Sequence, residues 1–181
     1  MKIQKATFAG GCFWCMEPPF DQKNGIICTI VGYTGGFKKN PTYKEVCAEI
    51  TGHAEAIEIS YDTTMLSYAE LLEVFWRNID PTALNRQFID VGSQYRTAIF
   101  YHNEGQRKLT EASRKKLDAS GRFKQKIVTD ILPAMEFYAA EAYHQNYYQK
   151  NPVQYHYYRA GSGRDQYLKR VWGDQALFPV A

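Results

Sequence analysis

The sequence has no long apolar run, and this absence limits where the protein can reside. No stretch is long enough to cross a membrane, and residues 1–5 lead into a strand pattern instead of the apolar core of a signal peptide. We therefore expect a cytoplasmic protein, in a compartment that keeps thiols reduced. In that setting a C-x-x-C motif indicates redox, catalytic or metal-binding chemistry, not a structural disulfide.

The sequence also lacks a strong charge bias and the motifs that bind phosphate. Its net charge of +3 is spread along the chain and does not indicate nucleic acid as a partner. Neither G-x-G-x-x-G nor a Walker sequence occurs, and no internal repeat is visible. With 181 residues, 45% of them hydrophobic and 23% charged, the composition fits one globular domain, which we expect to be monomeric.

Strand-like and helical segments alternate along the chain. Strands are predicted over 26–33, 54–61, 95–101 and 127–132, and helices over 12–20, 43–47, 67–79, 103–121 and 139–148. Ser67 with Glu70 forms a capping box, and Asn103 is a cap. The pattern predicts a sheet with packed helices in a single domain over 1–181, with an extended tail from about 160 to 181. Periodicity alone leaves the strand directions open.

The most distinctive stretch runs from Gly10 to Cys15, with the sequence GGCFWC. The glycines allow a sharp turn after a strand, so that a helix can begin at Cys12. A cysteine at a helix start meets the positive end of the macrodipole, so the pKa of Cys12 should fall and its thiolate should be nucleophilic. Cys15 lies one helical turn further on the same face, within reach of a disulfide.

Two ordinary explanations of this cysteine pair compete with catalysis. A zinc site needs a second C-x-x-C or a close pair of histidines, whereas Cys28 and Cys47 stand alone. We therefore expect no metal. Two buried structural cysteines would leave the double glycine unexplained.

Glu55 occupies an unusual position in the strand predicted over 54–61. Alternation places it on the same face as Ile57 and Ile59, which should be the buried face. Glu55 either reaches water at the edge of the strand, as glutamate usually does, or is a partly desolvated acid with a raised pKa.

Short motifs lie in a specific order along nearly the whole chain. They are GCFWC at 11–15, VGYTGG at 31–36, NPTYKEVC at 40–47, GHAEA at 52–56, QYRTAI at 94–99 and YHQ at 143–145. Through them the chain resembles the A-type peptide methionine sulfoxide reductases (MsrA). The resemblance implies a ferredoxin-like α/β (α+β) two-layer sandwich with a mixed, mainly antiparallel sheet. It also implies a single catalytic domain that reduces methionine-S-sulfoxide, free or in proteins, without a cofactor.

The resemblance assigns catalytic roles to residues in these motifs. Cys12 attacks the sulfoxide sulfur, while Tyr43, Tyr95 and Glu55 hydrogen-bond the sulfoxide oxygen, with Glu55 as the acid. This agrees with the chemistry, because the oxygen leaves only with protons, which a neutral carboxylic acid can supply. Phenol hydroxyls add donors where charge develops.

The resemblance also assigns substrate-binding residues. Phe13 and Trp14 hold the S-methyl group, since sulfur packs well against aromatic rings. Asp90 belongs to the polar network around the site. His144 lies in a motif of the family, but no chemical step follows for it.

This sequence departs from many members of the family in the cysteine that would return the oxidised Cys12 to its thiol form. Their resolving cysteine lies in a C-terminal tail, whereas this chain has no cysteine after Cys47. Cys15 takes a place often filled by glycine, so it is the candidate that converts the sulfenic acid of Cys12 into a disulfide. Thioredoxin is the expected reductant. Cys28 and Cys47 are expected to be structural.

Two other functions share parts of this pattern. A thioredoxin-like C-x-x-C dithiol–disulfide oxidoreductase is the main alternative, although no βαβ pattern surrounds the motif and such an enzyme would not need Glu55 and two tyrosines. A non-enzymatic peptide-binding module would use Phe13 and Trp14 without a reactive thiol.

Overall fold

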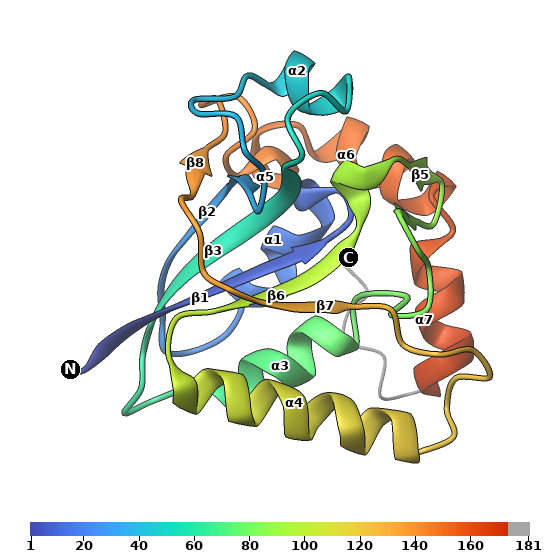
Figure 1. Cartoon of the computed structure of the whole chain (residues 1–181). Helices are drawn as coiled ribbons and strands as arrows, with labels where there is room; N and C mark the ends of the chain where they lie inside the picture. Colours follow the sequence, from blue (N-terminus) through green and yellow to red (C-terminus); the bar gives the residue numbers. More distant parts are fainter. Residues whose placement is uncertain (174–181) are drawn as a thin grey trace.

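A six-stranded sheet forms the centre of the computed structural model, which describes residues 1–173 (Figure 1). Its strands are β1 (Ile3–Gly10), β2 (Ile26–Thr34), β3 (Ala54–Asp62), β6 (Thr97–Tyr101), β7 (Asp130–Pro133) and β8 (Tyr138–Ala139). They follow the order β7-β6-β1-β3-β2-β8, with β6 and β7 parallel and the other pairs antiparallel. A separate ribbon pairs β4 (Arg86–Gln87) with β5 (Asp90–Val91). The expected mixed, mainly antiparallel sheet is confirmed.

The helices complete the expected topology. They are α1 (Phe13–Asp21), α2 (Tyr43–Cys47), α3 (Tyr68–Trp76), α4 (Glu104–Ala119), α5 (Tyr147–Lys150), α6 (Pro152–Gly161) and α7 (Arg164–Trp172). In the series β1-α1-β2-β3-α3-β6, strand β3 inserts between β1 and β2, and β6 pairs with the other edge of β1. This is the split βαβ arrangement of a ferredoxin-like fold.

The main core lies between one face of the sheet and helices α1 and α3. Phe8 of β1 stacks on Phe20 of α1 with ring centroids 5.6 Å apart, and on Phe75 of α3 at 5.1 Å. Ile57 and Ile59 of β3 are fully buried in the same core, as the strand alternation predicts.

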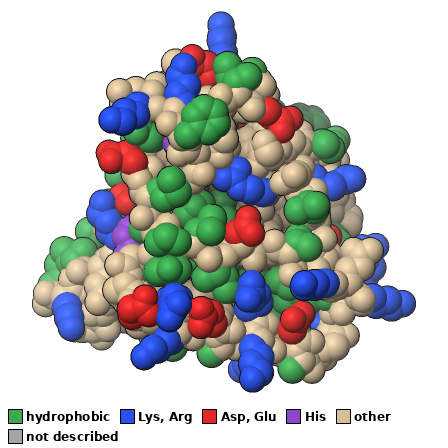
Figure 2. All heavy atoms as spheres, in the orientation of Figure 1, with side chains coloured by type: hydrophobic (Ala, Val, Ile, Leu, Met, Phe, Trp, Pro, Cys, Tyr) green, Lys and Arg blue, Asp and Glu red, His purple; other side chains and the backbone are tan. Residues whose placement is uncertain are grey.

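On the face of the molecule seen in Figure 2, basic side chains are interspersed with acidic ones.

Two predictions for the second half of the chain are wrong. Residues 139–148 are not one helix. The side chain of Gln145 accepts a hydrogen bond from the amide of Val31 and donates one to its carbonyl, and these two bonds hold the segment against the edge of β2. The tail expected from residue 160 is not extended over its described part. It comprises the last residues of α6 and the whole of α7. Helix α7 is stabilised because the side chains of Leu168 and Trp172 are buried against the core. Residues 174–181 lie outside the described part of the chain.

Candidate active site

The turn between β1 and α1 requires both of its glycines. Gly11 has a φ of +82°, and a Cβ atom there would lie 2.4 Å from Cβ of Gln87. A Cβ atom at Gly10 would lie 2.5 Å from Sδ of Met16. The turn makes Cys12 the N-cap residue of α1, and the amide of Cys15 donates to its carbonyl with N and O 3.0 Å apart. The predicted strand, turn and helix are confirmed.

The two thiols of the motif are free, buried and hydrogen-bonded to each other. Burial raises the pKa of Cys12, and its hydrogen bond with Cys15 and the charge of Glu55 raise it further. The same hydrogen bond lowers the pKa of Cys15, against the effect of burial and with help from the guanidinium groups of Arg164 and Arg159. The prediction of a lowered Cys12 pKa is therefore wrong for this state, because burial outweighs the helix terminus.

Glu55 lies inside the protein next to the cysteine turn, not at a wet edge of the sheet. Its side chain is 2% exposed, and Oε2 accepts a hydrogen bond from the backbone amide of Phe13 at 3.0 Å. Burial raises the pKa of Glu55 to about 8, with smaller contributions from the charges of Asp90 and Cys15. Of the two alternatives left by the sequence, the desolvated acid is the correct one.

The predicted polar residues gather around Glu55. Burial raises the pKa of Tyr43 and Tyr95, and the charge of Glu55 raises both further. Both phenols therefore stay protonated and can donate hydrogen bonds. Asp90, in β5, accepts a short hydrogen bond from the hydroxyl of Tyr158, and burial raises its pKa.

An aromatic wall stands beside Cys12. Phe13 is 1% exposed and Trp14 is half-buried, with the indole of Trp14 stacked on Tyr147 at a centroid distance of 3.9 Å. Nε1 of Trp14 donates to Nδ1 of His144 at 3.1 Å. No chemical step follows for His144 from the sequence, and in the structure it is the hydrogen-bond partner that orients the indole.

Two residues of the site were missed from the sequence. Tyr158 of α6 hydrogen-bonds the thiol of Cys12 as well as Asp90. Glu141 accepts the amide of Tyr43 at 2.9 Å and the hydroxyl of Tyr33 at 2.8 Å. The cluster of tyrosines in the last third of the chain was the available signal for Tyr158, but it does not single out one tyrosine.

The other two cysteines lie on the surface, and their expected structural role stays a prediction. Cys28 is exposed on β2, at a position where the register of β2 against β3 shifts. Cys47 is exposed at the end of α2 and hydrogen-bonds the hydroxyl of Tyr43.

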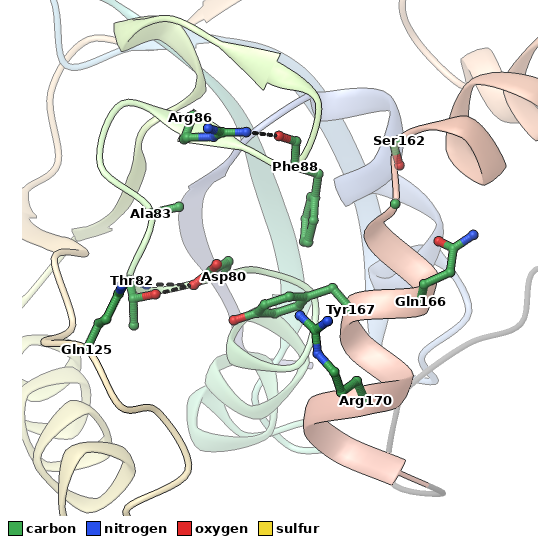
Figure 3. Close-up of a pocket in the computed structure, with 11 residues that line it drawn as sticks. Asp80, Thr82, Ala83, Arg86, Phe88, Gln125, Ser162, Gln166, Tyr167 and Arg170 are labelled. Carbon is green, nitrogen blue, oxygen red and sulfur yellow. Dashed lines mark hydrogen bonds between the residues drawn. The ribbon is translucent and has the colours of Figure 1, made fainter.

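An open pocket lies elsewhere, between α7 and the loop around Asp80 and Phe88 (Figure 3). It contains no cysteine and none of the predicted site residues. Within residues 1–173 no group of His, Cys, Asp and Glu side chains is arranged to hold a metal ion. No helix in that range is long and apolar enough to span a membrane.

Comparison with known proteins identifies the family of this site. A family model described as peptide methionine sulfoxide reductase matches residues 4–176. The chain belongs to the peptide methionine sulfoxide reductase family. The peptide methionine sulfoxide reductase MsrA of Bacillus licheniformis is 56% identical over 172 residues, which cover 95% of this chain and 95% of that protein.

Solved structures of this reductase family share the fold. Mxr1 from Saccharomyces cerevisiae in reduced form has a TM-score of 0.79 at 36% identity, covering 84% of this chain and 87% of that one. Mxr1 in complex with Trx2 has a TM-score of 0.57 at 26% identity, covering 81% and 85%. The sequence resemblance to MsrA is therefore confirmed, and the chain is a thiol-dependent reductase of methionine sulfoxide.

Proposed function

We propose that this reductase acts on methionine-S-sulfoxide, free or in proteins, with Cys12 as nucleophile and Glu55 as acid. The observation that carries the assignment is the buried carboxyl of Glu55, bonded to the amide of Phe13, the residue that follows Cys12. A carboxyl group with a pKa of about 8 is protonated at neutral pH and can give its proton to the sulfoxide oxygen. Protonated Tyr43 and Tyr95 add donors to that oxygen.

The reaction transfers oxygen from the substrate to Cys12. The sulfur of Cys12 attacks the sulfoxide sulfur, Glu55 protonates the oxygen, and the oxygen ends on Cys12 as a sulfenic acid. Methionine sulfoxide is reduced by two electrons and Cys12 is oxidised by two. Phe13 and Trp14 pack against the S-methyl group of the substrate, and His144 and Asp90 support that pocket through Trp14 and Tyr158.

Recycling then proceeds through Cys15. Its thiol is hydrogen-bonded to Cys12, so it can condense with the sulfenic acid to form a disulfide and water. A complex of the related Mxr1 with Trx2 supports thioredoxin as the reductant of that disulfide. The protein is proposed to be a monomer and to reside in the cytoplasm, where such a reductant is supplied. Size-exclusion chromatography tests the oligomeric state, and cell fractionation tests the location.

A single turnover without reductant tests the relay. Peptide mass mapping should find Cys12 joined to Cys15. Cys15→Ser should still release one equivalent of methionine, accumulate a sulfenic acid on Cys12 and lose turnover driven by thioredoxin. A disulfide from Cys12 to Cys47 or Cys28, or full thioredoxin-driven turnover in Cys15→Ser, would contradict the proposal. Cys28→Ser is the matched control and should cycle normally.

A further inference from the structure

Glu141 joins three parts of the active site that lie far apart in the sequence. It lies between β8 and α5, and its side chain is partly buried. Oε1 accepts the backbone amide of Tyr43, the first residue of α2, with N and O 2.9 Å apart. Oε2 accepts the hydroxyl of Tyr33 in β2 at 2.8 Å and lies 3.9 Å from Nε2 of His144. One carboxylate therefore faces donors from α2, from β2 and from its own segment.

Packing alone holds helix α2 weakly against the site. The helix has 5 residues, of which only Val46 is buried. It lies at the same end of the molecule as β8 and α5 (Figure 1). Because a helix this short is not stable by itself, its position depends on contacts with other segments. The hydrogen bond from the amide of Tyr43 to Glu141 is such a contact, and a bond to a carboxylate is about twice as strong as one between neutral groups.

The same carboxylate faces the second nitrogen of His144. Nδ1 of this imidazole accepts the indole N–H of Trp14, so in the neutral ring the proton is on Nε2. Nε2 is buried and has no hydrogen-bond partner among residues 1–173. A buried N–H without a partner is costly, and the negative charge of Glu141 at 3.9 Å reduces that cost. Glu141 therefore favours the form of His144 that binds Trp14.

We propose that Glu141 is a positioning residue of this reductase and acts through Tyr43 and His144. Its carboxylate holds Tyr43 where the sulfoxide oxygen binds. It also keeps the proton of His144 on Nε2, which leaves Nδ1 to accept the indole N–H of Trp14. The inference rests on the roles proposed for Tyr43 and Trp14. Although partial burial raises the pKa of Glu141, the hydrogen bonds from Tyr43 and Tyr33 lower it overall, so the group is a carboxylate at neutral pH.

Double-mutant cycles test the inference, because the effects of residues that act through one another do not add. Glu141→Ala should slow the single-turnover release of methionine by about tenfold, less than the loss of a whole donor to the oxygen. In a Tyr43→Phe background the same change should cost less than about twofold, since the hydroxyl that Glu141 positions is already gone. Glu141→Ala should also raise KM, and it should change KM little when combined with His144→Phe.

Two further variants serve as controls. Glu136→Ala changes an exposed glutamate between β7 and β8 and should leave the rate and KM unchanged. Glu141→Gln keeps one acceptor oxygen, so its rate should lie between those of Glu141→Ala and the wild type. It provides the same cycles if Glu141→Ala does not fold.

A purely structural role of Glu141 predicts a lower melting temperature with equal losses of rate in all backgrounds, and that result would overturn the inference. So would an unchanged rate and KM in Glu141→Ala. The proposed function is tested separately by Tyr43→Phe alone. A wild-type rate in that variant would remove the role proposed for Tyr43, and this inference with it.

Discussion

Among single residues, Glu55 is expected to set the pH range of the proposed first chemical step. Because burial raises its pKa to about 8, the carboxyl group is an acid at neutral pH and loses its proton above that value. Single-turnover release of methionine should therefore fall as the pH rises through about 8. In Glu55→Gln the step should be slower by on the order of 100-fold, since an amide donates a hydrogen bond but no proton. An unchanged rate in Glu55→Gln would move the acid role to Tyr43 or Tyr95.

The same carboxyl group should lower stability. Its pKa rises from 4.5 to about 8 on folding, so between these values the folded protein holds a proton that the unfolded chain has lost. The resulting cost grows with pH from about 4.5 to 8 and is constant above. Glu55→Gln removes it and should raise the free energy of unfolding at pH 8 by on the order of 4 kcal/mol. Urea titrations at pH 4 and pH 8 check this, and a gain of equal size at both would contradict it.

His144 is expected to act by orienting the indole of Trp14. Burial lowers the pKa of His144, so the ring is neutral and its Nδ1 accepts the Trp14 N–H. In His144→Phe that donor loses its partner, which costs on the order of 1–3 kcal/mol. We expect a higher KM with a nearly unchanged saturating rate, and partial rescue in His144→Gln. A fall in melting temperature with an unchanged KM would show that the contact is structural only.

Among the elements, α3 shows how a local signal stabilises the core without touching the site. Oγ of Ser67 accepts the amide of Glu70, and the Glu70 carboxylate accepts the amide of Ser67 at 2.8 Å. Ser67→Ala should therefore lower stability by about 1 kcal/mol. Denaturant midpoints should fall while KM stays constant, and Ser67→Asn should restore most of the loss. A change in KM would mean that α3 couples to the site.

At the scale of the whole molecule, the C-terminal helices close the fold over its N-terminal turn. Trp172 of α7 is 8% exposed and lies against the guanidinium group of Arg122 at 4.3 Å. Trp172→Ala should therefore cost about 3 kcal/mol, as truncations of buried aromatic residues do. Tyr157→Ala, at a 75% exposed position on α6, is the control and should unfold like the wild type. Equal thermal midpoints for both variants would mean that α7 contributes little to stability.

Local chemistry was predictable because it depends on neighbours in the chain. The glycine pair before Cys12, the caps at Ser67 and Asn103, and the alternation around Glu55 were all placed correctly from residue types and spacing. The conformation of residues 139–148 was not predicted correctly, because it depends on hydrogen bonds between the side chain of Gln145 and the backbone of Val31 in a strand far away in the sequence.

The sequence by itself determined the family, the cysteine motif and the polar residues that gather around Glu55, because these lie in short motifs whose order is visible in one dimension. Only the tertiary structure decided the protonation of the site. A pKa depends on burial and on charges brought from far along the chain, and here Arg159 and Arg164 reach a cysteine about 150 residues earlier. For that reason the rise in the pKa of Cys12 on burial was not predictable from the sequence.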